Sequence, residues 1–360
     1  MMNSTKIFVS AIMLFFTTAL CFCDSAFAEY LEVWGRNNYS QRNVPDSNDF
    51  VKIAAGANHN LALRSDGSII AWHYNDYSLC NNVPAGNGFI AIASGNLHSL
   101  ALKSDGSLVA WGYNYYGQCD VPVGNDFVYI AAGSYHNVAI RSDGSLTAWG
   151  QNNNGQCDVP TGNDFIEAAA GTHHNLAIKS DGTIVAWGNN TYGQLDVPSG
   201  TFIAVAAGAW HSVAIRSDGS LAEWGKNSYK NTFGNGYYKV AARNASESFL
   251  FREPLSSFEL PDGNDFIAIA TGSYHNLALR SDGSLAAWGY NSDGQCDVPV
   301  GNGFAAISAG DYHSLALRSK ICTNPIIGDL NGDCKVDCDD ITIIIQNWLE
   351  CNLEPPEACY

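Results

Sequence analysis

One motif, G-x-x-H-N-L-A-L-R-S-D-G-S-L-x-A-W-G, recurs along most of the 360-residue chain and restricts what it can fold into. Incomplete copies lie at Trp34-Gly35 and at His313–Arg318. A period of about 38 residues with many glycines is typical of a propeller blade or a β solenoid rather than a helical repeat. The complete copies are Gly56–His73, Gly95–Gly112, Gly133–Gly150, Gly171–Gly188, Gly208–Gly225 and Gly272–Gly289.

Each unit contains three short segments with the composition of β-strands. In one unit these are Phe127–Ala132, His136–Arg141 and Ser145–Trp149, which are rich in β-branched and aromatic residues. The turn Ser142-Asp143-Gly144 joins the last two as a hairpin, because Asp and Gly tolerate the positive φ that tight turns require. The polar linker that follows contains a proline, which ends strand pairing.

A three-stranded unit with two apolar faces can bury them only against its neighbours, and a ring does so without exposing long strand edges. Tyr30–Gly35 supplies a third strand with nothing before it, and Phe304–Arg318 supplies two strands with nothing after them. Together these segments make one whole blade. The sequence therefore predicts an all-β protein, a seven-bladed β-propeller over residues 29–320 that is closed by a seam between its two ends.

The spacing breaks once, between Trp224 and His275. Glu247–Arg252 aligns with the H-S-V-A-I-R strand, but the S-D-G hairpin and the tryptophan strand that should follow are missing. Residues 226–262 are therefore either an insertion in a seven-bladed ring or a stunted eighth blade. We expect seven blades, with eight as the alternative.

The repeated unit, extended to A-W-G-x-N-x-x-G-Q, resembles the regulator of chromosome condensation repeat over about residues 30–319. Its short period and x-V-P segment are more similar to the bacterial branch that includes beta-lactamase inhibitor protein II. The resemblance implies a seven-bladed propeller. It does not carry over nucleotide exchange on a small GTPase, because an exported acidic protein has no evident access to such a partner.

Composition and motifs exclude several functions. The net charge of −17 argues against binding to nucleic acid or to anionic lipid, both of which need a basic surface. Motifs for a serine hydrolase, a zinc protease or a phosphate loop are absent from the sequence. The acids of the C-D-V-P segments repeat with the blades, whereas a glycosidase needs one close, asymmetric pair. We therefore expect no enzymatic activity in the propeller.

The constant side chains of the repeat are expected to be structural. One histidine per blade is too widely spaced to share a metal ion, so we expect each to be hydrogen-bonded to backbone. The tryptophans are expected to pack between blades. The basic residue before each S-D-G turn is expected to form a local ion pair with charged neighbours at the rim.

Two positions vary between copies, and both lie at strand ends: the dipeptide before each histidine and the residues after each W-G. Both are rich in Tyr and Asn, and loops on a rigid scaffold are where binding residues usually lie. Aromatic side chains with polar tips make good contacts with proteins and sugars. If the ring closes, a ligand-binding face would hold Tyr135, His173, Trp210, Tyr274 and Tyr312.

The N-terminus reads as a signal peptide that covers residues 1–28. Lys6 precedes the apolar run Ile7–Leu20, and Ala26-Phe27-Ala28 matches a cleavage site. The run is too short to span a bilayer, and no other stretch is long and apolar enough. The sequence thus predicts Sec-dependent export from a bacterial cell, to the medium or the cell surface. In such an oxidising compartment, the five cysteines after residue 320 indicate one or two disulfides.

The tail, residues 321–360, contains a predicted calcium loop followed by a predicted helix at Ile341–Leu349. Oxygen ligands at EF-hand spacing suit a hard cation such as Ca²⁺. The stretch resembles one half of a type I dockerin, which implies a cohesin-like or cell-surface partner. Two departures put cohesin binding in doubt: Cys334 replaces an expected glycine, and only one loop is present. The predicted ligands are Asp329, Asn331, Asp333, Lys335 through its carbonyl, Asp337 and Asp340.

Two functions from different classes fit these features. The first is an exported, non-enzymatic propeller that binds a protein or a polysaccharide, with a calcium-dependent attachment tail. The second is a dockerin-bearing carbohydrate-active enzyme, or an accessory protein in polysaccharide degradation. A unique carboxylate pair in a pocket would favour the second.

Overall fold

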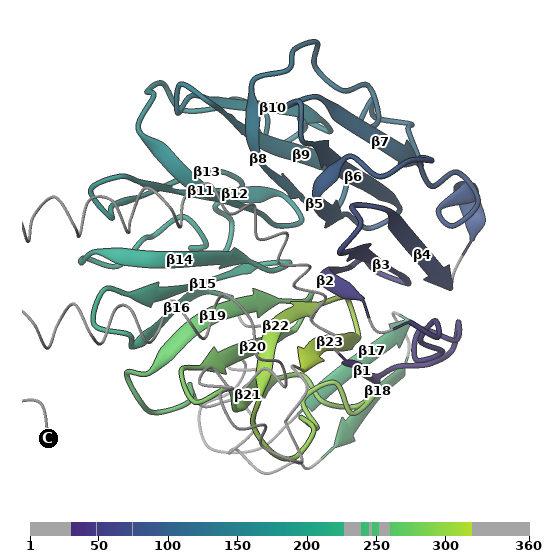
Figure 1. The fold of residues 1–360 in the computed structure, drawn as a ribbon. Coiled ribbons are helices and arrows are strands. Elements are labelled where there is room, and N and C mark those ends of the chain that lie inside the picture. Colours follow the sequence, from purple (N-terminus) through teal and green to yellow (C-terminus); the bar gives the residue numbers. More distant parts are fainter. Residues whose placement is uncertain are drawn as a thin grey trace, which may run out of the picture. The chain divides into compact units, whose positions relative to one another are not determined.

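The computed structural model describes residues 30–47, 49–73, 75–226, 239–244, 247–251 and 260–318. The regular structure among these residues is β-strand (Figure 1), apart from one 3-10 turn, η1 (Asp76–Ser78), and they contain no α-helix. No helix within the described ranges is long and apolar enough to cross a membrane. The predicted signal peptide, residues 1–28, and the predicted calcium-binding tail, residues 321–360, lie outside the described residues.

The described residues form seven three-stranded antiparallel sheets, numbered here in chain order, which repeat the same pattern. The second strand is central in each, paired with the first and the third. The sheets are β2 (Phe50–Ala55), β3 (His59–Arg64), β4 (Ile69–His73); β5 (Phe89–Ser94), β6 (His98–Lys103), β7 (Leu108–Gly112); β8 (Phe127–Ala132), β9 (His136–Arg141), β10 (Leu146–Gly150); β11 (Phe165–Ala170), β12 (His174–Lys179), β13 (Ile184–Gly188); β14 (Phe202–Ala207), β15 (His211–Arg216), β16 (Leu221–Gly225); β19 (Phe266–Thr271), β20 (His275–Arg280), β21 (Leu285–Gly289); and β22 (Phe304–Ala309), β23 (His313–Arg318), β1 (Tyr30–Gly35).

The first two predicted strands of the third sheet are confirmed, and the last one begins one residue later than predicted. Ser145 belongs to the turn, because its amide donates to the Asp143 carboxylate at 2.9 Å. Gly144 has a φ of +81°, and its amide donates to the Arg141 carbonyl at 2.8 Å. The hairpin therefore needs glycine at its last turn position.

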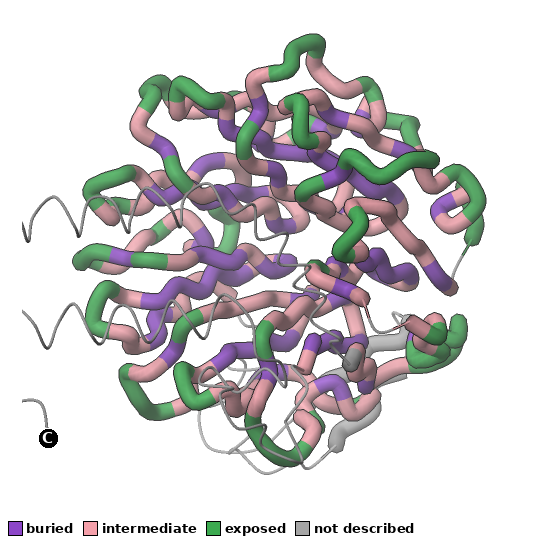
Figure 2. The backbone as a smooth tube through the Cα atoms, in the orientation of Figure 1, coloured by how far each residue is buried: buried purple, intermediate pink, exposed green. Residues whose placement is uncertain are grey.

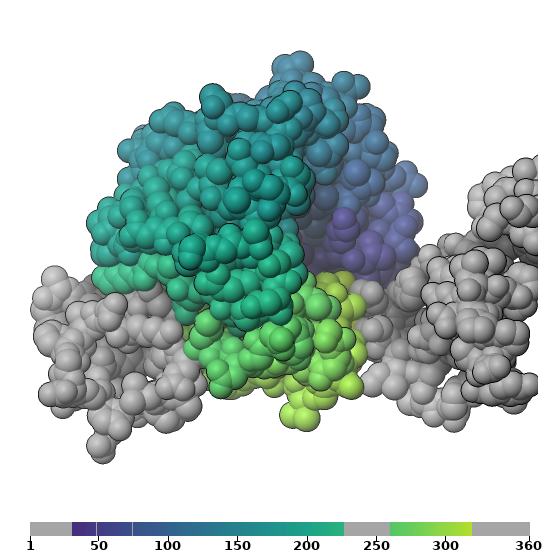
Figure 3. Space-filling view, turned by 90° about the vertical axis from the view of Figure 1, so that its left-hand side faces the viewer, coloured from purple at the N-terminus to yellow at the C-terminus, as the bar shows by residue number. Residues whose placement is uncertain are grey.

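The two ends of the repeat region share one sheet. β1 pairs antiparallel with β23 over its whole length, with Trp34 opposite Ser314 and Gly35 opposite His313. β23 pairs with β22 on its other side. Figure 3 shows the first described segment (purple) beside the last (yellow-green).

The first strands of the sheets contact one another in sequence. These contacts lead from β2 through β5, β8, β11, β14, β19 and β22, and β22 in turn contacts β2. Between β16 and β19 the chain forms a separate two-stranded sheet, β17 (Lys239–Asn244) and β18 (Glu247–Phe251). β18 begins at Glu247, the residue that aligns with the repeat histidine in the decayed copy.

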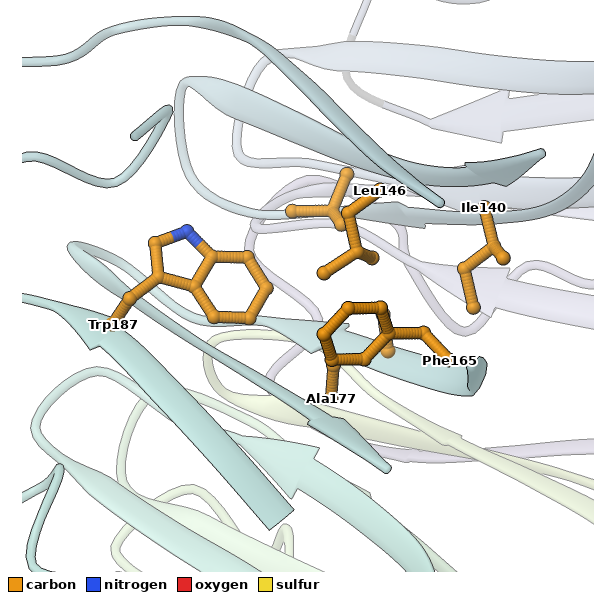
Figure 4. Packing of buried hydrophobic residues seen from close by; sticks show 7 residues of the cluster. Ile140, Leu146, Phe165, Ala177 and Trp187 are labelled. Atoms are coloured by element: carbon orange, nitrogen blue, oxygen red, sulfur yellow. The ribbon is translucent and has the colours of Figure 1, made fainter. Parts of the chain in front are cut away.

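Apolar side chains from adjacent sheets interlock to form the core. Between the third and fourth sheets, Ile140 and Leu146 pack with Phe165, Ala177 and Trp187 (Figure 4). Equivalent clusters recur between other neighbouring sheets. The central strands are buried on both faces, whereas the turns are exposed (Figure 2). Each buried Leu, Ile or Phe contributes about 1.5–3 kcal/mol, so neighbouring sheets stabilise one another.

Among the described residues, four of the basic residues before the S-D-G turns pair with a carboxylate other than the one next to them in the chain: Arg64, Arg141, Lys179 and Arg280. Arg141 pairs with Asp126, which precedes the first strand of its sheet, and Arg280 pairs with Asp265 in the same way. The turn residue Asp143 instead accepts a hydrogen bond from the Ser145 hydroxyl at 2.6 Å. The ion pair therefore links the first strand to the second.

Candidate functional site

A buried hydrogen bond from the repeat histidine links each of the seven sheets to the next. In the third sheet, His136 Nε2 lies 2.7 Å from Asn175 Oδ1 of the fourth sheet. Where the next sheet carries serine, as at His174, the partner is a hydroxyl, that of Ser212 at 3.0 Å. The other bonds are His59–Ser99, His98–Asn137, His211–Asn276, His275–Ser314 and His313–Asn60.

The expectation that these histidines bind backbone is wrong. Their partner is the residue that follows histidine in the next copy, the N or S of H-[NS]-L-A. Because an amide oxygen only accepts, Nε2 of His136 carries the proton and donates to Asn175. The Nδ1 atom of His136 is buried without a hydrogen-bond partner among the described residues.

In five of the seven described sheets, the asparagine or serine donates to the carbonyl of a buried glutamine in the linker before its own sheet. Asn175 Nδ2 donates to the Gln156 carbonyl at 2.8 Å, and Trp187 Nε1 donates to the same oxygen at 3.1 Å. The Gln156 side chain accepts from the Asn154 amide at 2.8 Å, which holds its loop in place. The recurring His, Asn, Gln and Trp therefore form one structural network at the junction of the third and fourth sheets.

Burial keeps the histidines uncharged. Desolvation lowers the pKa of His136 to about 4, although the bond to Asn175 opposes the shift. For His275, desolvation and then the charge of His211 lower the pKa to about 3. The described residues contain no cluster of three or more possible metal ligands. These histidines can therefore act as scaffold at neutral pH.

The glycine three residues before each histidine allows two close approaches. A Cβ on Gly171 would lie 2.5 Å from the carbonyl oxygen of Gly208 in the next sheet and 2.8 Å from His174 Cε1. A Cβ on Gly310 would meet the carbonyl of Gly56, which continues the series from the last repeat to the first. Both contacts explain why glycine recurs at this position.

Both variable sets lie at the same end of the sheets. The residue after W-G donates its amide to the carbonyl of the residue before histidine, as from Gln151 to Tyr135 at 2.9 Å and from Tyr290 to Tyr274 at 2.8 Å. Arg36 binds Tyr312 in the same manner at 2.9 Å. One surface therefore carries both sets, and we call it the loop face.

The predicted ligand residues fall into three separate groups on the loop face. Tyr135 contacts Tyr113 and Tyr116, with ring centroids 5.9 and 5.5 Å apart. His173 contacts Trp210 at 5.4 Å, and Tyr274 contacts Tyr312 at 6.1 Å. All five predicted residues are half-buried. The structure thus pairs four of them and places Tyr135 in a larger tyrosine cluster.

Residues after W-G complete these groups. Tyr77 and Tyr115 join the cluster around Tyr113, with centroid distances of 4.9 and 6.3 Å. Tyr192 lies 5.3 Å from Trp210, and the Lys226 ammonium lies 4.4 Å from the Tyr192 ring. The third group adds Tyr290 and Arg36, whose guanidinium lies 3.7 Å from the Tyr312 ring centroid. Each group therefore combines residues from both variable positions.

A cavity of about 70 Å³ lies where the seven sheets meet. Each repeat lines it with the glycine of the motif and one residue on either side. The residue after the glycine varies among five residue types in the seven copies, and only Asp311 is charged. The residues at this position are Ala57, Asn96, Ser134, Thr172, Ala209, Ser273 and Asp311.

Asp311 is a feature that reasoning from the sequence missed. Its carboxylate accepts a hydrogen bond from the Ser273 hydroxyl at 2.7 Å. Burial raises its pKa, which Ser273 and then Arg36 oppose. The available signal was the aspartate itself, because the other six copies carry an uncharged residue at this position.

Comparison with a family model decides the nature of the repeats. Six segments match the model of the regulator of chromosome condensation (RCC1) repeat: residues 50–77, 89–118, 127–156, 165–194, 202–230 and 266–295. The repeats belong to this family. Over 68 residues, or 19% of the chain, the sequence is 38% identical to the X-linked retinitis pigmentosa GTPase regulator homolog of Caenorhabditis elegans, and the match spans 5% of that protein.

Solved propellers of RCC1 type share the fold. Prp20p from Saccharomyces cerevisiae superposes with a TM-score of 0.64 at 18% identity, covering 83% of this chain and 93% of that chain. Human WBSCR16 gives 0.63 at 18% identity, covering 81% and 99%. The ectodomain of the Arabidopsis thaliana receptor kinase ACR4 gives 0.57 at 19% identity, covering 77% and 96%. At these identities the likeness shows the fold alone.

Four cysteines of the RCC1 repeats are half-buried, and within the described residues no disulfide joins any two of them: Cys80, Cys119, Cys157 and Cys296. The Cys119 thiol lies 3.3 Å from the Tyr113 carbonyl, and burial, followed by the charge of Asp120, raises its pKa to about 11. These thiols therefore act as packing groups in the linkers. The predicted calcium ligands, Asp329 to Asp340, fall outside the described residues.

Proposed function

We propose that this protein is a non-enzymatic binding protein whose loop face holds a protein partner. The observation that carries the proposal is the gathering of three aromatic groups at one end of the sheets. The constant side chains of the repeat are committed to the scaffold, whereas the residues of this face vary from copy to copy. Tyr and Trp provide large contact areas with a polar tip and are enriched where proteins bind.

The proposed scaffold is a closed ring of seven blades. Contacts between β14 and β19 support this arrangement, because they join the fifth and sixth sheets without β17 and β18 between them. The bond from His211 to Asn276 spans the same junction at 2.8 Å. In the alternative of eight blades, residues 226–262 would supply the additional, stunted blade.

Export and attachment are part of the proposal. Residues 1–28 would direct export, and the tail, residues 321–360, would bind Ca²⁺ and attach the propeller to a surface or an assembly. The EF-hand spacing of Asp329, Asp333 and Asp337 supports calcium as the ion. A cohesin-like partner is the corresponding expectation for the tail.

A polysaccharide is the second candidate ligand. Tyr115 is 77% exposed and is nearly parallel to Tyr113, at an interplanar angle of 15°. Such a tyrosine pair offers an open ring surface to a sugar. The related proposal of a carbohydrate-active enzyme would require product release, which separates it from binding without turnover.

A pull-down from the native cell envelope tests the loop face. We expect wild-type protein to retain a partner, and Trp210→Ala and Tyr274→Ala each to reduce retention at least tenfold, as expected for aromatic residues at the centre of an interface. Ile203→Ala is the control, because Ile203 is 54% exposed at the other end of β14. Equal retention by all four proteins would contradict a role of the loop face.

Two further measurements separate the alternatives. Incubation with plant and algal polysaccharides should release no product, and retention on an insoluble polysaccharide without turnover would favour a sugar ligand. Calorimetry should show that Asp329→Ala loses the calcium binding of the full chain. An unchanged calcium titration would contradict the ligand assignment in the tail.

A further inference from the structure

The axial cavity differs in charge from the rest of the ring that encloses it. Six of its seven variable lining residues are uncharged, and the seventh is Asp311. A space of about 70 Å³ holds on the order of two water molecules, so it fits a head group rather than a whole small molecule. The cavity therefore offers one carboxylate to a small polar or cationic group.

Among the described residues, no ion pair includes Asp311. Its one hydrogen-bond donor in the described ranges is Ser273, at 2.7 Å. The nearby cation Arg36 is bound to Asp293 through two contacts, at 3.0 and 3.3 Å, and its guanidinium lies against the Tyr312 ring. The charge of Arg36 is thus already matched by Asp293.

Aromatic rings of the loop face lie within electrostatic reach of Asp311. Burial raises the pKa values of Tyr135 and Tyr274, and the negative charge of Asp311 raises both further. Burial, then the charges of Tyr274 and Asp311, do the same for Tyr312. A carboxylate with nearby tyrosine rings suits a cation, because the ring faces attract positive charge and the carboxylate neutralises it.

We propose that the axial cavity binds the cationic side chain of a lysine or arginine from the partner protein, with Asp311 as its counter-ion. The proposal rests on the proposed function, since the same partner would cover the aromatic groups around the cavity. The net charge of −17 would also attract a basic partner surface. The Ser134 and Thr172 hydroxyls, which lie 3.1 Å apart, add polar lining to the cavity.

Calorimetry with n-butylammonium tests the site on the full chain without knowledge of the partner. We expect wild-type protein to bind this cation and to show no binding of n-butanol, its neutral analogue. Asp311→Asn should weaken n-butylammonium binding at least tenfold, because it removes the counter-ion. Asp46→Asn is the matched control, since Asp46 is exposed and the change in net charge is the same.

Asp311→Ser guards against a folding defect, because Ser134 and Ser273 occupy the equivalent position in two other repeats. It should fold as the wild type and lose the cation as Asp311→Asn does. Equal affinity for n-butylammonium in wild type and both Asp311 variants, or absence of binding to the wild type, would overturn the proposal. If n-butylammonium does not bind the wild type while Trp210→Ala still abolishes retention of the partner, the proposed role of the loop face holds and the proposed axial cation site is wrong.

Discussion

The histidine network and the loop face occupy adjacent positions in every repeat but differ in what they tolerate. His136 and Asn175 belong to a network that recurs with the same geometry from sheet to sheet. Ser134 and Tyr135, just before His136, are replaced by other residues in most of the copies. The network is buried and joins the sheets, whereas the loop face has few structural partners to satisfy. Constancy in this chain therefore marks the scaffold, and variation marks the face that we propose for recognition.

Acidification should break the network most severely. Above pH 6.5 the histidines are neutral in both the folded and the unfolded state. Below that pH the histidines of the unfolded chain become protonated, whereas the buried rings of the folded protein stay neutral. Because the folded pKa values of His59 and His98 are lowered to about 3 and about 4, the free energy of unfolding should fall by about 1.4 kcal/mol per pH unit for each such histidine. His136, His174, His275 and His313 behave alike.

The summed loss from six such histidines exceeds the usual free energy of unfolding of a domain, so we expect the protein to unfold at about pH 5. Tryptophan fluorescence in urea at several pH values measures the effect. His136→Gln is less stable at pH 7 but cannot titrate, so its stability should decline less steeply with acid than that of the wild type. A free energy of unfolding that stays constant from pH 7 to pH 5 would contradict this account.

A methyl group added to the glycine three residues before a repeat histidine should have the next largest effect on the free energy of unfolding. Gly171→Ala would place Cβ against the Gly208 carbonyl and the His174 ring, and we expect a loss of about 3 kcal/mol. Gly88→Ala is the control, because its Cβ would find no atom closer than Ser104 Oγ at 3.9 Å. Urea unfolding compares the two, and equal losses would show that close approach is not why glycine recurs.

Two substitutions of Asn175 should differ in how much they lower the free energy of unfolding. Asn175→Ala leaves His136 Nε2 without an acceptor and the Gln156 carbonyl without one of its donors, at a cost of about 2 kcal/mol. Asn175→Ser should cost less, because Ser212 accepts from His174 and donates to the Gln194 carbonyl in the next sheet. Similar losses in urea unfolding for both variants would exclude hydrogen bonding as the role of this position.

Much of the fold could be predicted from the sequence because the same pattern of strands and turns recurs many times along the chain. The strands of the third sheet and the pairing of Tyr30–Gly35 with the last repeat follow from local spacing and turn chemistry. The hydrogen-bond partner of His136 could not be predicted in this way, because Asn175 lies on another sheet and only the packing between sheets brings it close. The same holds for Arg141, whose ion pair reaches Asp126 across a strand rather than the neighbouring Asp143.

The candidate site was predicted in part. Aromatic enrichment before each histidine indicated Tyr135 and Trp210, but the division into three groups depends on which residues after W-G reach them. Asp311 was overlooked because its significance arises only when seven equivalent positions meet around one cavity. A single repeat carries no information about which residue will be the one charge at that point.

Substitutions on the loop face should have the smallest effect on the free energy of unfolding. Tyr115 is 77% exposed and contacts Tyr113 and Tyr116, with no bond to the network. Tyr115→Ala should therefore change the free energy of unfolding by no more than about 0.5 kcal/mol, as is usual for surface substitutions. If the tyrosine cluster contacts the partner, the same variant should weaken its retention, whereas Asn175→Ser should leave retention unchanged. A variant that loses stability without losing the partner would place Tyr115 with the scaffold, and would narrow the recognition surface to the groups around Trp210 and Tyr274.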